Sequence, residues 1–162
     1  MTRRPVVGVI GTGQANQDVE QQARELGAAI ARQGWVLVNG GRAAGVMQAS
    51  AEGARSADGL VVGVLPSAGS EDPSADVAQA VDVAVFTDMG EARNNVNVLT
   101  ADAIVALPGG AGTLSEAALA VENDRPLIVL GGSTPRAIAG HAHEVDTVDE
   151  ALAALVSRVG DG

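Results

Sequence analysis

The sequence predicts an α/β protein with a Rossmann-like, doubly wound fold, in which a parallel sheet of six or seven strands carries helices on both faces. Three observations support this fold class. The 162 residues match the size of one domain and no linker or repeat divides them, so we assign residues 1–162 to a single nucleotide-binding-like domain. Short β-branched runs alternate with segments of helical periodicity. Glycine clusters follow several of these runs, as they do in turns that approach a ligand.

The predicted strands are short apolar runs, which is typical of parallel strands buried on both faces. They cover residues 5–10, 35–38, 60–65, 81–86, 103–107, 127–130 and, more briefly, 144–145. The predicted helices place apolar residues at helical spacing. They cover residues 18–33, 46–57, 90–100, a stretch from the glycine motif at 108–113 to about 122, and 148–159. Residues 67–80 show no clear period and predict a surface loop.

The composition excludes several classes of chemistry. All ten basic residues are arginine, and the absence of lysine excludes Schiff-base chemistry, including that of pyridoxal phosphate, and a Walker A phosphate loop. The absence of cysteine excludes thiol catalysis, iron–sulfur clusters and zinc ribbons. His141 and His143 lie in a predicted loop without a third ligand at recognisable spacing. We therefore expect neither a metal site nor a resident cofactor.

The charge and hydropathy patterns restrict the partners. A net charge of −10, one Phe, one Trp and no Tyr argue against binding of polymeric nucleic acid. No apolar run approaches the ~18 residues of a membrane span, and the first apolar run is shorter than the ~7–15 residues of a signal peptide. We therefore expect a cytoplasmic protein that does not associate with membranes. A small anionic ligand remains compatible, because backbone N–H groups and one or two arginines can bind it.

Four glycine clusters each follow a predicted strand, at positions 11/13, 40/41, 109/110/112 and 131/132. Because the carboxyl ends of parallel strands meet at one edge of the sheet, the clusters predict a phosphate or nucleotide site at that edge. Gly11-Thr12-Gly13 resembles part of the dinucleotide fingerprint but lacks its third glycine and the downstream acidic residue. We interpret Gly11 and Gly13 as a tight turn or a secondary ligand contact.

The strongest single signal is the segment 108–116, with the sequence Pro-Gly-Gly-Ala-Gly-Thr-Leu-Ser-Glu. Between a strand and a helix, its glycines leave N–H groups free to face an anion, the helix dipole adds partial positive charge, and Thr113 adds a hydroxyl. Glu116 has two interpretations. Either its carboxylate completes a Thr113-x-x-Glu116 capping box, which the spacing alone favours, or it belongs to the site.

The ordered set of motifs resembles the LOG family, whose best-understood members are cytokinin-activating phosphoribohydrolases. Segment 108–116 is similar to the Pro-Gly-Gly-x-Gly-Thr-x-x-Glu signature of that family. Residues 40–47 resemble its glycine turn that leads to Gly-(Leu/Val)-Met, and residues 89–93 resemble its arginine element ahead of the signature. The resemblance covers roughly residues 5 to 130. The older label of the family, lysine decarboxylase-like, fails here because no lysine exists to hold pyridoxal phosphate.

The resemblance implies a set of site residues. Arg93 and Glu116 would be the catalytic pair, and a carboxylate there can stabilise the oxocarbenium-like state of N-glycosidic cleavage or activate water. This family context moves Glu116 from a cap to a site residue. The residues implied for phosphate and nucleotide binding are Gly109, Gly110, Gly112, Thr113, Gly40, Gly41 and Met47. Gly11 and Gly13 join these candidates from the glycine clusters at the same edge, not from the resemblance. Arg42 either contacts a phosphate or is a solvated loop residue.

One departure keeps two functions open. Asn94 follows Arg93, where the plant-type enzymes have lysine, and this form resembles a neighbouring group of short proteins that includes molybdenum-cofactor carrier proteins. The first function is a phosphoribohydrolase that releases a base and ribose 5-phosphate from a nucleoside 5′-monophosphate. The alternative is a non-catalytic carrier or sensor of a phosphorylated ligand such as the molybdenum cofactor.

The resemblance also implies a homodimer or a higher homo-oligomer. Small residues on a helix face would allow close packing between copies, and the candidates are Ala117, Ala118 and Ala120.

Overall fold

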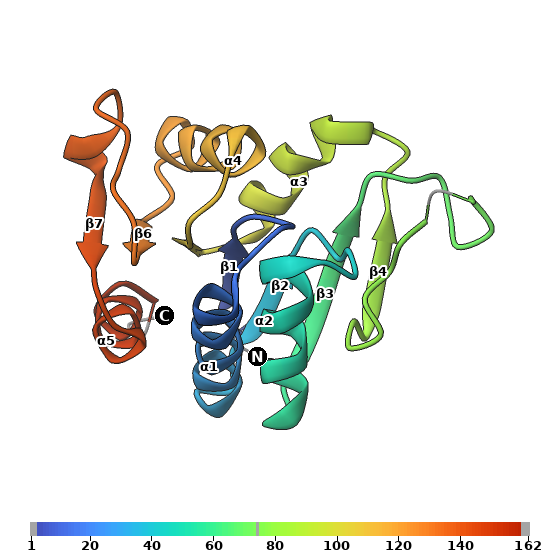
Figure 1. Cartoon of the computed structure of the whole chain (residues 1–162), viewed down its shortest axis with the longest axis horizontal. Helices are drawn as coiled ribbons and strands as arrows, with labels where there is room; N and C mark the ends of the chain where they lie inside the picture. The colour runs from blue at the N-terminus through green and yellow to red at the C-terminus, as the bar shows by residue number, and fades with distance from the viewer. Residues whose placement is uncertain (1–2, 74, 160–162) are drawn as a thin grey trace.

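The computed structural model describes residues 3–73 and 75–159, which build a seven-stranded sheet (Figure 1). The strand order is β4-β3-β2-β1-β5-β6-β7, and every neighbouring pair is parallel. The strands are β1 (Val6–Ile10), β2 (Val36–Asn39), β3 (Leu60–Leu65), β4 (Val83–Phe86), β5 (Ala103–Ala106), β6 (Leu127–Leu130) and β7 (Ala142–Val145). The predicted α/β class and the parallel sheet are confirmed.

Five α-helices divide between the two faces of the sheet. One face carries α1 (Gln17–Arg32), α2 (Gly45–Ser56) and α5 (Val148–Val159), which gather in the lower half of Figure 1. The other carries α3 (Arg93–Thr100) and α4 (Ala111–Glu122), in its upper part. Two 3-10 turns, η1 (Gly90–Ala92) and η2 (Ala139–His141), complete the elements. None of the helices in the described residues is long and apolar enough to cross a membrane.

Two apolar cores, one on each face, hold the layers together. Along β1, Val7 and Val9 belong to the core under α1, α2 and α5, whereas Ile10 belongs to the core under α3 and α4. This alternation follows from the two-residue period of a strand. Burying such a side chain contributes roughly 1.5–3 kcal/mol relative to leaving it exposed. The sheet is therefore fixed from both sides at β1, directly below the loops that form the site.

Helices α1 and α2 approach each other at two glycines. A methyl group on Gly27 would overlap the backbone carbonyl of Ser50, and one on Gly53 would overlap the carbonyl of Arg24. Only glycine allows the two backbones to come this close. The loops after β1 and β2 therefore lead into two helices whose backbones are in direct contact.

The structure departs from the predicted elements around β4. Val83 and Val85 are 47% and 38% exposed, so the expectation of strands buried on both faces is wrong for this strand. The reason is its position, because β4 is the edge of the sheet and a loop rather than a helix leads from β3 to it. The helix expected over 90–100 starts as the 3-10 turn η1 and becomes α-helical at Arg93.

The strand order reverses at β1. The chain runs outward from β1 to β4, then returns and places β5 against the other side of β1. Helix α1 follows β1 on one face, and α4 follows β5 on the opposite face. The loops after these two strands therefore part at the carboxyl edge, where open α/β sheets bind ligands.

Candidate functional site

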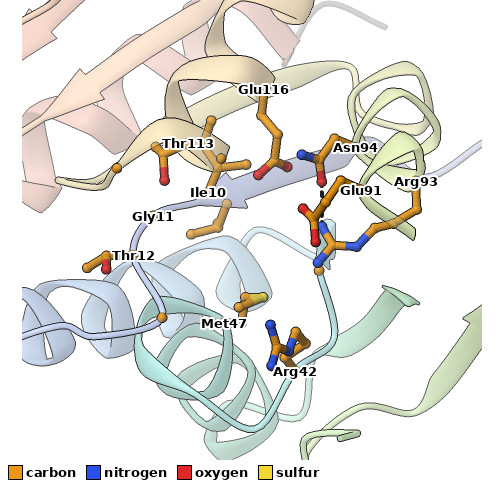
Figure 2. A pocket seen from close by; sticks show the side chains of 15 residues that line it. Ile10, Gly11, Thr12, Arg42, Met47, Glu91, Arg93, Asn94, Thr113 and Glu116 are labelled. Carbon is orange, nitrogen blue, oxygen red and sulfur yellow. Dashed lines mark hydrogen bonds between the residues drawn. The ribbon is translucent and has the colours of Figure 1, made fainter. Parts of the chain in front are cut away.

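A cavity of about 260 Å³ lies at this point of reversal (Figure 2). Four segments that are far apart in the sequence line it: the loop after β1, the turn after β2, the start of α3 and the start of α4. The lining residues with polar side chains are Thr12, Arg42, Glu91, Arg93, Asn94, Thr113 and Glu116. Ile10 and Met47 supply apolar surface between them.

The N-terminus of α4 forms one end of the cavity. Its N-cap is Gly110, which provides no side chain to bond the first N–H groups, and the first turn contains no acidic residue. Those N–H groups have no acceptor within the helix. The hydroxyl groups of Thr113 and Thr12 lie at the same end, and the N–H of Thr12 donates to the carbonyl of Pro108 at 3.1 Å. This end offers several donors and the positive end of a helix dipole to an anion.

A buried asparagine shapes the turn after β2. Asn39 is fully buried, its Oδ1 accepts from the N–H of Gly41 at 2.8 Å, and its Nδ2 donates to the carbonyl of Met47 at 2.9 Å. Gly41 adopts a φ of +73°, which favours glycine. At Gly40 a methyl group would lie 2.6 Å from Met47 Sδ and 3.1 Å from both Nη atoms of Arg93. The turn therefore leaves space for the arginine side chain.

Arg93 is a buried cation without a carboxylate partner. Its side chain is 5% exposed, its Nη1 donates to Asn94 Oδ1 at 2.6 Å, and its buried Nε has no hydrogen-bond partner. Across residues 3–73 and 75–159 the ion pairs are Arg3–Asp102 and Arg24–Glu52, so no counter-ion is paired with this guanidinium. A buried charge is costly unless it is paired. Its place beside the cavity points to an anionic or acceptor group on a ligand.

Glu116 enters the cavity from the second turn of α4. The side chain is 8% exposed and its Oε2 accepts from Asn97 Nδ2 at 2.7 Å. Burial raises the pKa of Glu116 above its usual value, and the negative charge of the nearby Glu91 raises it further. The hydrogen bond from Asn97 and the positive charge of Arg93 lower the pKa but do not cancel the rise. The capping-box interpretation is wrong, because the helix starts at Ala111 and the carboxylate bonds to Asn97.

Most residues singled out from the sequence meet at this cavity. Nine of them line it, namely Gly11, Gly13, Gly40, Met47, Arg93, Gly110, Gly112, Thr113 and Glu116. Gly41 and Gly109 do not. Gly41 is buried behind the turn after β2, and Gly109 lines a separate cavity of about 350 Å³ between α4 and the loop after β6. A methyl group on Gly109 would overlap the side chain of Thr113, so this glycine shapes the turn.

Sequence reasoning missed Asn97 and left Arg42 open. Asn97 is 1% exposed and lies one helical turn after Arg93, so its spacing of four residues was a usable signal for a shared helix face. Arg42 lines the cavity, as does Glu91. The small residues proposed for contacts between copies are only partly available, since Ala117 and Ala120 are buried against this chain's own sheet and Ala118 is exposed.

A model of the SLOG cluster4 family matches residues 4–156, which is most of the chain. The chain belongs to the SLOG cluster4 family. This membership agrees with the predicted resemblance to LOG proteins and to the short group that includes molybdenum-cofactor carriers.

Two solved structures of molybdenum-cofactor proteins are similar to this chain over nearly its whole length. The molybdenum cofactor binding protein of Rippkaea orientalis is 36% identical with a TM-score of 0.86, over 97% of this chain and 98% of that one. The molybdenum cofactor carrier protein of Chlamydomonas reinhardtii is 36% identical with a TM-score of 0.84, over 96% and 98%.

A curated relative is similar over a shorter stretch. The cytokinin riboside 5′-monophosphate phosphoribohydrolase of Mycobacterium tuberculosis is 42% identical over 94 residues, which is 58% of this chain and 49% of that protein. The match thus spans about half the length of that enzyme.

Proposed function

We propose that this protein binds a small phosphorylated ligand in the cavity at the carboxyl edge and acts as a carrier of a phosphorylated pterin of the molybdenum-cofactor class. The observation that carries the proposal is Arg93, a buried guanidinium with an unpartnered Nε and no carboxylate partner, beside a cavity that ends at the free N–H groups of α4. The similarity to molybdenum-cofactor proteins over nearly the whole chain supports the choice of ligand class.

The phosphate would occupy the end of the cavity formed by α4. There it would accept hydrogen bonds from the first N–H groups of the helix and from the hydroxyl of Thr113. The rest of the ligand would extend over Ile10 and Met47 toward Arg93. These local donors act at short range, so the overall charge of −10 does not prevent binding of an anion.

Binding is tested by calorimetry with ribose 5-phosphate on the protein and on Thr113→Val. Thr100→Val is the matched control, because Thr100 lies at the far end of α3 and bonds only to the carbonyl of Val96. We expect saturable binding that weakens about 10-fold in Thr113→Val, the order of one lost charge-assisted hydrogen bond, and is unchanged in the control. Absence of binding, or equal affinity in the two variants, would contradict the phosphate position.

The ligand class is tested on protein purified from a host that makes molybdenum cofactor. We expect molybdenum and pterin, the latter measured by the fluorescence of its oxidised form, to co-purify with the protein in equal molar amounts. Both should be lost together in Thr113→Val. A chain that never retains pterin, while it binds phosphates normally, would contradict the carrier function.

A second function, hydrolysis of a nucleoside 5′-monophosphate, is favoured by the meeting of Arg93 and Glu116 at one cavity. Water would attack the anomeric carbon as the N-glycosidic bond breaks, with its proton passing to Glu116 and then to the leaving base. A raised pKa suits this exchange, because a general base works best when its pKa is near the working pH. Chromatography of AMP and GMP reactions decides the matter. Base release that is lost in Glu116→Gln supports hydrolysis, and its absence contradicts it.

A further inference from the structure

Two charged side chains that line the cavity have no role in the proposed binding of the phosphate. Arg42 and Glu91 both line the cavity, on the side away from Thr113 and Thr12 (Figure 2). Neither side chain takes part in a hydrogen bond or an ion pair within the described ranges of the chain. A guanidinium and a carboxylate thus face the ligand space without being satisfied by the protein.

The backbone under Arg42 is fixed although its side chain is exposed. Arg42 forms an antiparallel bridge with Val77, the N–H of Ala78 donates to the carbonyl of Gly41 at 2.8 Å, and the N–H of Ala43 donates to the carbonyl of Asp76 at 3.1 Å. The returning part of the long loop before β4 therefore holds the arginine at the rim. Glu91 has a comparable anchor, because it lies in η1 immediately before the buried start of α3.

The two groups have opposite hydrogen-bonding characters. A guanidinium offers a planar fork of donors and matches two adjacent acceptors, whereas a carboxylate matches two adjacent N–H donors. Guanine and the fully oxidised pterin ring present both patterns on different edges: a carbonyl beside a ring nitrogen that carries no hydrogen, and a ring N–H beside an amino group. Adenine has neither two adjacent acceptors nor two adjacent N–H donors, so it satisfies at most one hydrogen bond of each pair.

We infer that Arg42 and Glu91 determine the specificity of the site by reading a 2-amino-4-oxopyrimidine ring, as found in guanine nucleotides and in phosphorylated pterins. Arg42 donates to the carbonyl edge and Glu91 accepts from the amino edge. Ile10 and Met47 line the same cavity and form the apolar surface on which the ring rests, with the polarizable sulfur of Met47 against its face. This inference rests on the phosphate position proposed above and adds the chemical identity of the ring.

Calorimetric titrations with four probes test it: GMP, IMP, AMP and neopterin monophosphate. GMP and IMP differ only in the 2-amino group, so their ratio reports on Glu91. IMP and AMP differ at the 6-position and the adjacent N1, so their ratio reports mainly on Arg42. We expect GMP to bind about 10-fold more tightly than IMP, and IMP about 10-fold more tightly than AMP, the lower part of the range for a bidentate pair. The ratio of neopterin monophosphate to GMP decides between a pterin and a guanine as the preferred source.

Two variants and two matched controls assign the ratios to residues. Glu91→Gln should abolish the preference for GMP over IMP, and Arg42→Met, which keeps the apolar stem, should abolish the preference for IMP over AMP. Glu122→Gln and Arg32→Met, exposed at the ends of α4 and α1, should leave both ratios unchanged.

The possible failures are distinguishable. If the probes and ribose 5-phosphate all bind with one affinity, the phosphate site stands and the ring-reading inference is overturned. Ratios that persist in Glu91→Gln and Arg42→Met overturn it equally. If neither ribose 5-phosphate nor any probe binds, the proposed function fails and this inference fails with it.

Discussion

Replacing Asn97 with leucine tests whether this amide holds Glu116 in the cavity. Asn97 is 1% exposed and its Nδ2 donates to Glu116 Oε2 at 2.7 Å, so the change leaves a buried carboxylate without its donor. A hydrogen bond to a charged group contributes about 1.5–3 kcal/mol. We expect the free energy of unfolding to fall by that order at pH 8, where Glu116 is ionised in the unfolded chain.

The loss should depend on pH. Burial already raises the pKa of Glu116, and the Asn97 bond is the largest opposing contribution, so the variant has a still higher pKa in the folded state. A carboxyl group whose pKa is higher in the folded than in the unfolded state favours folding while it is protonated and costs stability as it ionises. Because the pKa of Glu116 in the unfolded chain is the same for both proteins, it cancels from the comparison. The difference in stability therefore grows as the pH rises from the folded pKa of the unaltered chain to the higher folded pKa of the variant, and it is constant above that value.

Urea denaturation at pH 4 and pH 8 measures this on four proteins: the unaltered chain, Asn97→Leu, Glu116→Gln and the double variant. We expect the loss caused by Asn97→Leu to be larger at pH 8, and the pH dependence to vanish in the Glu116→Gln background. An equal loss at both pH values, or one that persists with its pH dependence in that background, would refute the coupling.

Three further changes have defined outcomes. Gly27→Ala forces α1 and α2 apart and should lower stability by about 1–3 kcal/mol in urea denaturation, an overpacking cost that an unchanged midpoint would contradict. Gly40→Ala presses on the guanidinium of Arg93 and should weaken ribose 5-phosphate binding about 10-fold with a small change in stability; tight binding in calorimetry would count against it. Burial raises the pKa of Asp102, but its bonds to Arg3 and to a backbone N–H lower it overall, so Asp102→Asn should lose stability at pH 7 and match the unaltered chain under acid. A difference that persists at pH 2 would exclude this origin.

Most of the fold was predictable from local sequence patterns. The predicted strands lie within two residues of the observed ends in most cases, because a buried parallel strand is recorded in four to six neighbouring apolar residues. The exposure of Val83 and Val85 could not be found this way. It depends on β4 being an edge strand, and strand order is set by the packing of distant segments.

The glycine motifs made the position of the site predictable. They did not predict which side chains face the cavity, because that depends on how distant segments pack together. The motifs identified the correct turns but not which glycine in each faces the cavity, as Gly41 and Gly109 illustrate. The capping box that the spacing of Thr113 and Glu116 favours does not form, because helix α4 begins at Ala111, two residues before Thr113. Arg42 needed the bridge to Val77, a contact between segments about 35 positions apart that no local rule supplies.

The glycine contact between α1 and α2 makes one wall of the cavity stiff. Because the helices meet backbone to backbone, neither can slide without the other. Their leading loops are also joined, since the N–H of Val46 donates to the carbonyl of Thr12 at 3.0 Å. The loops before α1 and α2 are therefore held together both by this hydrogen bond and by the contact between their helices. A ligand therefore meets, on this side of the cavity, a wall whose two loops keep their positions relative to each other.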